Sequence, residues 1–161
     1  MVGNERKLEQ REILFRGKCF GNKEWIKDGE WVEGLPMYTA NKSEKGKIDR
    51  ILTLRDGYYS ILLVDPETVC QYTGLTDKND RKIFEGDIVK YHFGEDVAPV
   101  RFGSYQSCFD SQQAEHCGFY VDWKAEKNLR KDLGYWVHMV DAEIVGNIHD
   151  NLELIGADKQ G

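Results

Sequence analysis

Two carboxylates close together in the chain have the residue types and spacing that could do chemistry. Glu85 and Asp87 stand two positions apart, with Gly86 between them. On a regular strand both would point to one face, where such a pair can act as general acid and base or hold a divalent cation. In the structural alternative, Gly86 bends the strand, Asp87 accepts hydrogen bonds from the freed backbone N–H groups, and Glu85 is solvated. We favour the structural interpretation.

Thiols and imidazoles are the second set of candidates. Cys108, His116 and Cys117 lie near one another in the sequence, but they lack the C-x₂-C or H-x₃-H spacing of zinc sites. No Ser or Cys stands in a nucleophile motif such as G-x-S-x-G, and the four cysteines form no CxxC pair, which predicts reduced thiols without disulfides. The other histidines fall in separate predicted strands: His92, His138 and His149. We therefore predict no catalytic residue, no metal ligand and no cofactor.

Aromatic side chains offer a third possibility, a base-stacking platform on a small nucleic-acid-binding barrel. The net charge is −6, and residues 81–161 alone carry nine basic and 14 acidic side chains. The mildly basic run between Lys42 and Arg55 is interrupted by Glu44 and Asp49, which is typical of a solvated surface. Because nucleic-acid binders usually carry a basic patch, core packing is the favoured role of these aromatics: Trp25, Trp31, Tyr72, Phe84 and Tyr91.

Alternating apolar residues predict the strands that would position these side chains. Residues 12–18 and 30–38 are expected to form an antiparallel pair, the second strand being broken by Gly34 and Pro36. Asp56-Gly57 between residues 48–54 and 58–64 predicts a tight hairpin. Residues 69–91 predict two further strands, joined by a polar turn at 76–80.

The second half of the chain is less regular. We expect strands at 97–102, 119–123, 135–140 and 143–148, and one short helix at 125–133 that ends at Gly134. Residues 103–118 are predicted to be a long loop or insertion. Since long loops in compact domains often bind partners, Tyr105 and Phe109 are speculative partner-binding residues.

Composition bounds the class of protein. With 161 residues, 40% hydrophobic and 12% aromatic, the chain is expected to form one ordered domain at 11–155, between loose ends at 1–10 and 156–161. The predicted fold is mainly β: a single small, strongly bent antiparallel barrel or sandwich with one short helix, the alternative being α+β. Without a bilayer-spanning run or a signal peptide, a cytoplasmic protein with no membrane partner is expected.

The run VDPETVCQYTGLTDKNDRKIFEGDIV, residues 64–89, resembles the signature of the YopX family. REILFRGK…GEWVEG at 11–34 and EIVGNIHDNLELI at 143–155 agree with it, so the resemblance brackets residues 11–155. Two departures are Cys70, where the family usually has Gly, and Asn79-Asp80, where it usually has Asn-Gly. The signature residues are expected to be structural: Gln71, Tyr72, Thr73, Gly74, Leu75, Asp77, Gly86 and Asp87.

The resemblance implies an uncharacterised phage- or prophage-encoded protein in a bacterial host cell, from a family without an established activity. A non-enzymatic module that contacts a host or phage protein is the favoured function. A nucleic-acid-binding small β-barrel comes second, and a metal-dependent enzyme built on Glu85 and Asp87 comes last.

Overall fold

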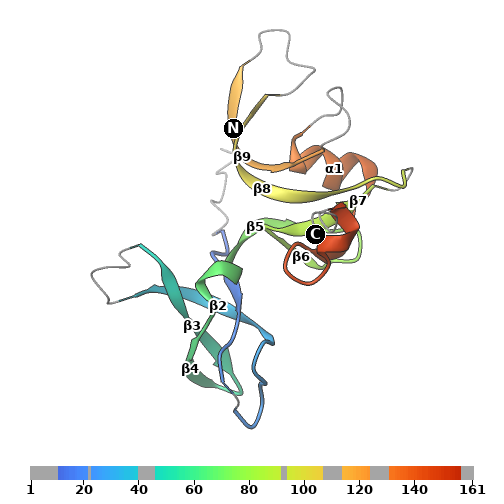
Figure 1. Ribbon diagram of the computed structural model, residues 1–161. Coiled ribbons are helices and arrows are strands. Elements are labelled where there is room, and N and C mark those ends of the chain that lie inside the picture. The colour runs from blue at the N-terminus through green and yellow to red at the C-terminus, as the bar shows by residue number, and fades with distance from the viewer. Residues whose placement is uncertain are drawn as a thin grey trace, which may run out of the picture.

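The computed structural model describes residues 11–21, 23–39, 46–91, 94–106, 114–123 and 131–156. Within them the chain forms two antiparallel sheets and one short α-helix (Figure 1). The strand order is β4-β3-β2-β1-β5-β6 in the first sheet and β10-β7-β8-β9 in the second, and neither sheet closes into a barrel among the described strands. The predicted mainly β fold is confirmed, in its sandwich-like form.

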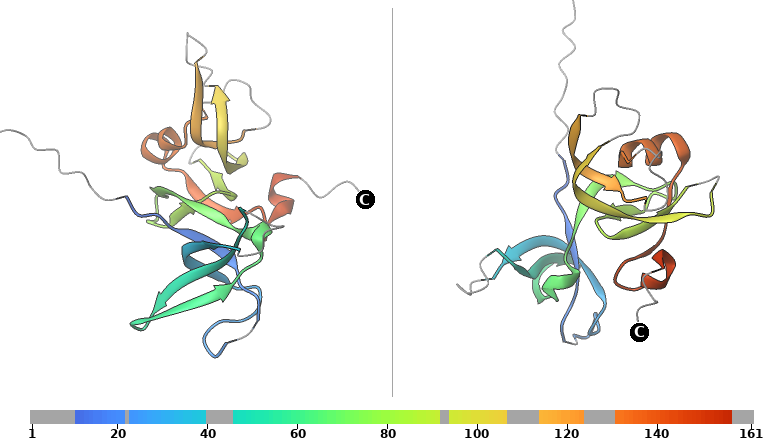
Figure 2. Two further views of the ribbon diagram at one scale, coloured as in Figure 1. Left: turned by 90° about the vertical axis from the view of Figure 1, so that its left-hand side faces the viewer. Right: turned by 45° about the horizontal axis from the view of Figure 1, so that its top comes forward.

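The first sheet contains β1 (Phe15–Lys18), β2 (Trp31–Tyr38), β3 (Ile48–Arg55), β4 (Tyr58–Leu63), β5 (Cys70–Thr76) and β6 (Lys82–Phe84). The second contains β7 (Asp87–Lys90), β8 (Val97–Gln106), β9 (Glu115–Val121) and β10 (Glu143–Asn147). The helix is α1 (Leu133–Val140), and short 3₁₀ turns occur at Pro66–Thr68 and Leu152–Ile155. Strands β2, β3 and β4 of the first sheet form one end of the molecule, and the second sheet with α1 forms the other (Figures 1 and 2). Strands β5 and β6 lie between them, beside the second sheet. No helix in the described part of the chain has the length and apolarity needed to cross a membrane.

The hairpin β3–β4 forms where the Asp-Gly pair predicted it. Asp56 and Gly57 both have positive φ, 51° and 81°, as a primed hairpin turn requires. The predicted break in β2 is wrong, because the strand runs through Gly34 and Pro36. A Cβ at Gly34 would lie 2.1 Å from the carbonyl oxygen of Leu52, so this glycine permits close strand packing.

The chain crosses from the first sheet to the second at Gly86. The predicted second strand of the 69–91 segment is split there into β6 and β7, and Gly86 has φ +81°, so the predicted bend is confirmed. Its N–H donates to the carbonyl of Val100, and its own carbonyl accepts from the N–H of Ile148, both at 2.8 Å. Gly86 thereby links the crossing to β8 and to the turn after β10.

The predicted loop at 103–118 is largely strand. β8 and β9 pair from Val100 opposite Val121 out to Gln106 opposite Glu115, while residues 107–113 lie outside the described part of the chain. Gly103 and Gly118 face each other in this ladder, and the Tyr120 ring lies 3.8 Å from where a Cβ of Gly103 would be. The aromatic neighbour fills the space that the glycines leave, so their presence does not break the pairing.

The predicted strand at 135–140 is wrong, because these residues belong to α1. Most of the predicted helix at 125–133 lies outside the described residues, and Gly134 stands inside α1 rather than ending it. The helix ends at Asp141, which has a left-handed conformation. Trp136 is 3% exposed and its ring centroid lies 4.9 Å from that of Trp123, so core packing overrides the strand propensity of this segment.

Candidate functional site

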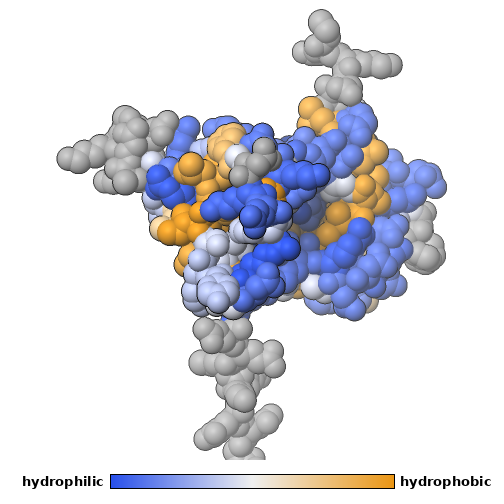
Figure 3. All heavy atoms as spheres, turned by 90° about the horizontal axis from the view of Figure 1, so that it is seen from below, coloured by the Kyte–Doolittle hydropathy of each residue, from blue (hydrophilic) through white to orange (hydrophobic). Residues whose placement is uncertain are grey.

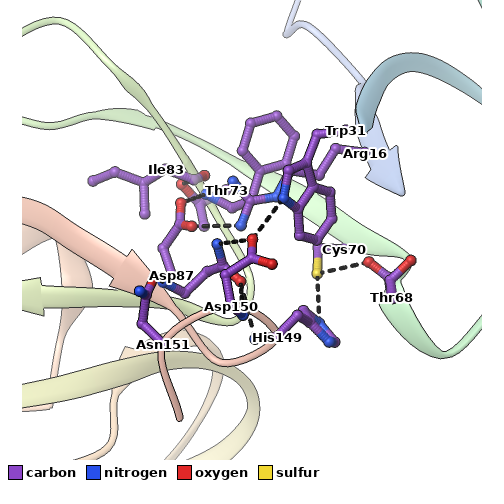
Figure 4. A network of polar contacts seen from close by, with 12 residues as sticks. Arg16, Trp31, Thr68, Cys70, Thr73, Ile83, Asp87, His149, Asp150 and Asn151 are labelled. Carbon is purple, nitrogen blue, oxygen red and sulfur yellow. Dashed lines mark hydrogen bonds and ion pairs between the residues drawn. The ribbon is translucent and has the colours of Figure 1, made fainter. Parts of the chain in front are cut away.

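A network of polar contacts lies where the two sheets meet (Figure 4). We call this place the junction: Arg16 and Lys18 of β1, Trp31 of β2, the β6–β7 turn, and the turn 147–151 after β10. The same region contains Glu85 and Asp87, the predicted carboxylate pair.

The structure gives the two carboxylates different surroundings. Asp87 is 1% exposed; it forms an ion pair with the Arg16 guanidinium and accepts a hydrogen bond from the N–H of Phe84 at 2.8 Å. Glu85 stands in the turn and lines a surface hollow. Within the described residues, no group of three or more His, Cys, Asp and Glu side chains is placed to hold a metal ion. Asp87 therefore satisfies a backbone donor at the bend, as the structural interpretation predicted.

Arg16 is held by two aromatic rings as well as by Asp87. Its guanidinium carbon lies 4.6 Å from the ring centroid of Trp31 and 4.6 Å from that of Phe84, both within cation–π range. Burial raises the pKa of the Asp87 carboxyl, and the Arg16 charge and the Phe84 N–H oppose that rise. The arginine is thus fixed in one geometry that joins β1 to β7.

Asp150 makes the second link between the sheets. It forms an ion pair with Lys18 and accepts hydrogen bonds from Trp31 Nε1 and Asn147 Nδ2, each at 2.9 Å. Partial burial alone would raise its pKa, but these three donors outweigh it and hold the pKa at about 2. The carboxylate is consequently ionised in neutral solution and ties the 147–151 turn to β1 and β2.

Cys70 and His149 are brought together at the junction, which the sequence did not predict. Cys70 Sγ lies 3.6 Å from His149 Nε2 and also donates to the carbonyl of Thr68 at 3.2 Å. Burial raises the pKa of the Cys70 thiol to about 11, while burial and the nearby Arg16 and Lys18 charges lower the pKa of His149. A reactive thiolate–imidazolium pair requires the opposite shifts, so this contact stays neutral and lacks an activated nucleophile.

The hollows beside the junction are small. One of about 200 Å³ is lined by Cys70, Glu85 and His149 among others, and a neighbouring one of about 260 Å³ is lined by Phe15, Val69 and other residues. Both fall below the roughly 300–1,000 Å³ of typical small-molecule sites.

The signature residues hold the β5–β6 hairpin and its neighbours. The Tyr72 and Phe84 rings lie 5.6 Å apart, and Thr73 Oγ1 donates to the carbonyl of Ile83 at 2.8 Å. Gln71 and Gly74 contribute through the backbone: the Gln71 carbonyl accepts from the N–H of Glu85, and Gly74 has φ +87°. Leu75 packs against the core of the second sheet.

Asp77 organises the turn between β5 and β6. Its carboxylate accepts from the backbone N–H groups of Asn79, Arg81 and Ile144 and from the Arg81 guanidinium, at 2.7–3.0 Å. Burial would raise the pKa of Asp77, but these donors hold it below its ordinary value. Asp80 adopts φ +60° in the position where the family usually has Gly.

The remaining predicted binding residues that the structure describes lie together on the β8–β9 ladder. Tyr105 lies on β8, where its ring stacks with those of His116 and Tyr120 and its hydroxyl donates to Asp132 at 3.3 Å. Phe109 and Cys108 lie outside the described residues, and His116 and Cys117 point to opposite faces of β9 because they are consecutive in a strand. The imagined zinc cluster is therefore not assembled among the described residues.

The aromatics considered as a base-stacking platform are packed instead. Tyr72 and Phe84 are buried, and Tyr91 packs against Trp123 and Trp136. The described cations of the basic run each lie near an acidic partner: Lys47 with Glu67, Arg50 with Asp49 and Arg55 with Asp56.

The fold and the junction together define the class of protein: a β protein of two sheets that are joined by the polar contacts of the junction. The family described as YopX protein matches residues 14–156, and the chain belongs to the YopX family. The crystal structure of protein EF1440 from Enterococcus faecalis is similar, with a TM-score of 0.47 and 21% sequence identity over 91% of this chain and 99% of that one. No match was found among curated proteins.

The sequence missed the partners of Asp87 and Cys70 because they are distant in the chain. Arg16 lies 71 residues from Asp87, and His149 lies 79 residues from Cys70. The only signal available was that the opening and closing segments of the resemblance contain Arg16 and His149.

Proposed function

We propose that this protein is a non-enzymatic protein-interaction module of phage or prophage origin, acting in the cytoplasm of the bacterial host on a phage- or host-encoded protein. The observation that carries the proposal is an uncovered apolar surface on the first sheet. The family resemblance supports the phage origin.

The apolar surface follows from strand register. Leu35 of β2 is opposite Leu52 of β3, which is opposite Ile61 of β4, and directly opposed residues share a face. Period-two alternation adds the neighbours on the same strands. The resulting set, here called the bare apolar face, is Leu35, Leu52, Leu54, Tyr59, Ile61 and Leu63.

Five of these six side chains are more than half exposed, from 51% for Leu35 and Leu63 to 72% for Tyr59. Together they expose on the order of 500 Å² of apolar surface, a size that in soluble proteins often marks an interaction site. Figure 3 views the molecule from the end of the first sheet and shows hydrophobic residues gathered in patches between hydrophilic ones.

The competing functions have less support. The thiol–imidazole contact is neutral and Asp87 is buried in an ion pair, so these residues supply no activated nucleophile and no paired carboxylates for acid–base chemistry. This argues against an enzyme built on them. Nucleic-acid binding would need cations and stacking rings on one surface, and the described candidates are paired with acids or packed.

A binding experiment with matched variants tests the proposal. Tagged protein would be crosslinked in bacteria that also express the untagged phage region, and the recovered chain would then be purified and titrated by calorimetry. Ile61→Lys should weaken binding at least tenfold, because it places a charge within an apolar contact.

Met139→Lys is the control, because Met139 is 72% exposed on α1 and lies off the bare apolar face. It should bind like the natural protein. Equal binding by Ile61→Lys, or recovery of no binding protein, would contradict the proposal.

A further inference from the structure

We infer that the partner of the bare apolar face is a second copy of this chain, packed face to face across a two-fold axis. The inference rests on the proposed function and names the occupant of the same surface.

The first argument is that the first sheet is covered along only part of one face. Arg16 lies on the same face as Glu33, its cross-strand partner, and therefore on the same face as Leu35. Near Arg16 that face is covered by Asp87 and by the turn that contains Asp150. Beyond Trp31 on β2, and over β3 and β4, the described residues of this face are largely exposed, and only residues 11–13 lie alongside Leu35. A second sheet face, stacked about 10 Å away, is the layer that completes such a sandwich.

The second argument is charge complementarity. On β2 and β3, only two charged side chains point to the same side of the sheet as the bare apolar face. They are Glu33 and Arg50. Glu33 precedes Leu35 by two residues, and Arg50 precedes Leu52 by two residues. Because β2 and β3 are antiparallel and Leu35 is opposite Leu52, Glu33 and Arg50 lie at opposite ends of the face.

This placement is self-complementary. Consider two copies stacked face to face, related by a two-fold axis that lies between the faces and runs perpendicular to the strands. This rotation reverses the strand direction of the second copy. The end of the face with Glu33 in one copy therefore lies over the end with Arg50 in the other. Two opposite-charge pairs form, and the apolar residues pack between them. Arg50 lies 3.4 Å from Asp49, and its guanidinium has further N–H donors for a second carboxylate.

The third argument is area. Two bare apolar faces would together bury on the order of 1,000 Å² of apolar surface, about the lower limit for a specific protein–protein interface. The rims of the two sheets add polar area to that figure. Because buried area does not set affinity, the dimer has to be sought over a wide range of concentrations.

The mass of the purified full chain in solution, measured by light scattering on gel filtration between about 5 and 200 µM, tests the inference. The natural protein and Met139→Lys should be dimers at the upper concentrations, and Ile61→Lys a monomer with an unchanged circular dichroism spectrum. A natural protein that stays monomeric throughout overturns the inference.

Charge exchange tests the arrangement itself. Glu33→Arg and Arg50→Glu should each weaken the dimer about tenfold or more, because each places like charges opposite one another. An equimolar mixture of these two variants should restore dimers as heterodimers, since every charge then faces its opposite. Single variants that dimerise like the natural protein, or a mixture that stays monomeric, overturn the face-to-face arrangement.

The result also separates the inference from the proposed function. If the natural chain is monomeric while another purified protein binds it and does not bind Ile61→Lys, the second copy is overturned and the interaction module stands. If neither self-association nor such a protein is found, both are overturned.

Discussion

The two ends of one face of the first sheet are opposite in both burial and polarity. Where the second sheet covers it, the face contains an ion pair between Arg16 and a 1%-exposed Asp87. Where nothing described covers it, the face presents leucine, isoleucine and tyrosine side chains such as Ile61, 52% exposed. A monomer stabilised only by its own folding would place charge outside and apolar groups inside.

The difference shows that the two contacts have different tasks. A buried ion pair contributes little net stability but penalises any packing that separates its members, so it fixes how the two sheets meet. An apolar surface contributes binding free energy to the contact that covers it, but it does little to fix the orientation of the partner, because the hydrophobic effect is non-directional. The junction is therefore built for one fixed internal contact, and the bare apolar face for an external one.

The largest expected effect comes from breaking the buried pair. Asp87→Ala leaves the Arg16 charge and the Phe84 N–H without their partner, and we expect a loss of about 3–5 kcal/mol in the free energy of unfolding. Urea denaturation followed by tryptophan fluorescence would measure it. Asp87→Asn should cost less, because its amide oxygen can still accept from the Phe84 N–H. Equal losses for the two variants would show that this hydrogen bond contributes nothing.

A substitution at the crossing between the sheets should have the next largest effect. Gly86→Val places a β-branched residue at φ +81° and its Cβ 3.2 Å from the Ile148 side chain, which we expect to cost about 1–3 kcal/mol. Gly57→Val is a useful comparison, because Gly57 also has positive φ but meets nothing within 4 Å. The difference in denaturation midpoint between the two variants isolates the steric part, and a Gly86→Val midpoint equal to that of the natural protein would refute the bend.

The second link at the junction predicts a pH dependence. The folded-state pKa of Asp150 is about 2, below its ordinary value of 3.8, so its contribution is present above pH 4 and is lost as the pH falls towards 2. Because the side chain is 37% exposed, solvent screening limits this contribution to about 1 kcal/mol. Unfolding free energies measured from pH 5 to pH 2 should therefore fall less steeply for Asp150→Asn than for the natural protein. Asp56→Asn, at an 88%-exposed carboxylate, should leave the slope unchanged.

The smallest expected effect on folding is at the bare apolar face. Ile61→Lys should change the free energy of unfolding by less than about 0.5 kcal/mol when measured at a concentration where the chain is monomeric. Thermal denaturation at about 1 µM checks this expectation. A loss of about 2 kcal/mol or more would mean that the face is covered within the monomer, and the comparison between the two ends would then fail.

Local patterns in the sequence predicted the local part of the fold. Asp56-Gly57 predicts its hairpin because both residues tolerate positive φ. The alternation in residues 30–38 predicts β2, which pairs with β1 as expected. The helix at 133–140 was not predictable, since Tyr135, Trp136 and Val137 favour strands and only the packing of Trp136 against Trp123 and Tyr91 makes a helix there.

The sequence predicted only those contacts of the candidate site that join residues close together in the chain. The bend at Gly86 and the bond from Asp87 to the Phe84 N–H involve neighbouring residues, and the sequence indicated both. Arg16 and Asp150 act through partners in distant strands, and no spacing in the chain encodes such contacts. The bare apolar face was equally hidden, because a strand that is apolar on both faces is typical of a buried strand.

The strand order of the first sheet has a consequence for how the chain is made. β1 pairs with both β2 and β5, and its Arg16 meets Asp87 only after 71 further residues have left the ribosome. The segment that supplies Asp150 is synthesised later still, 132 residues after Lys18. The first strand can therefore pair with β2 early, but the charged partners of Arg16 and Lys18 are synthesised much later. Such non-local pairing predicts folding in milliseconds to seconds.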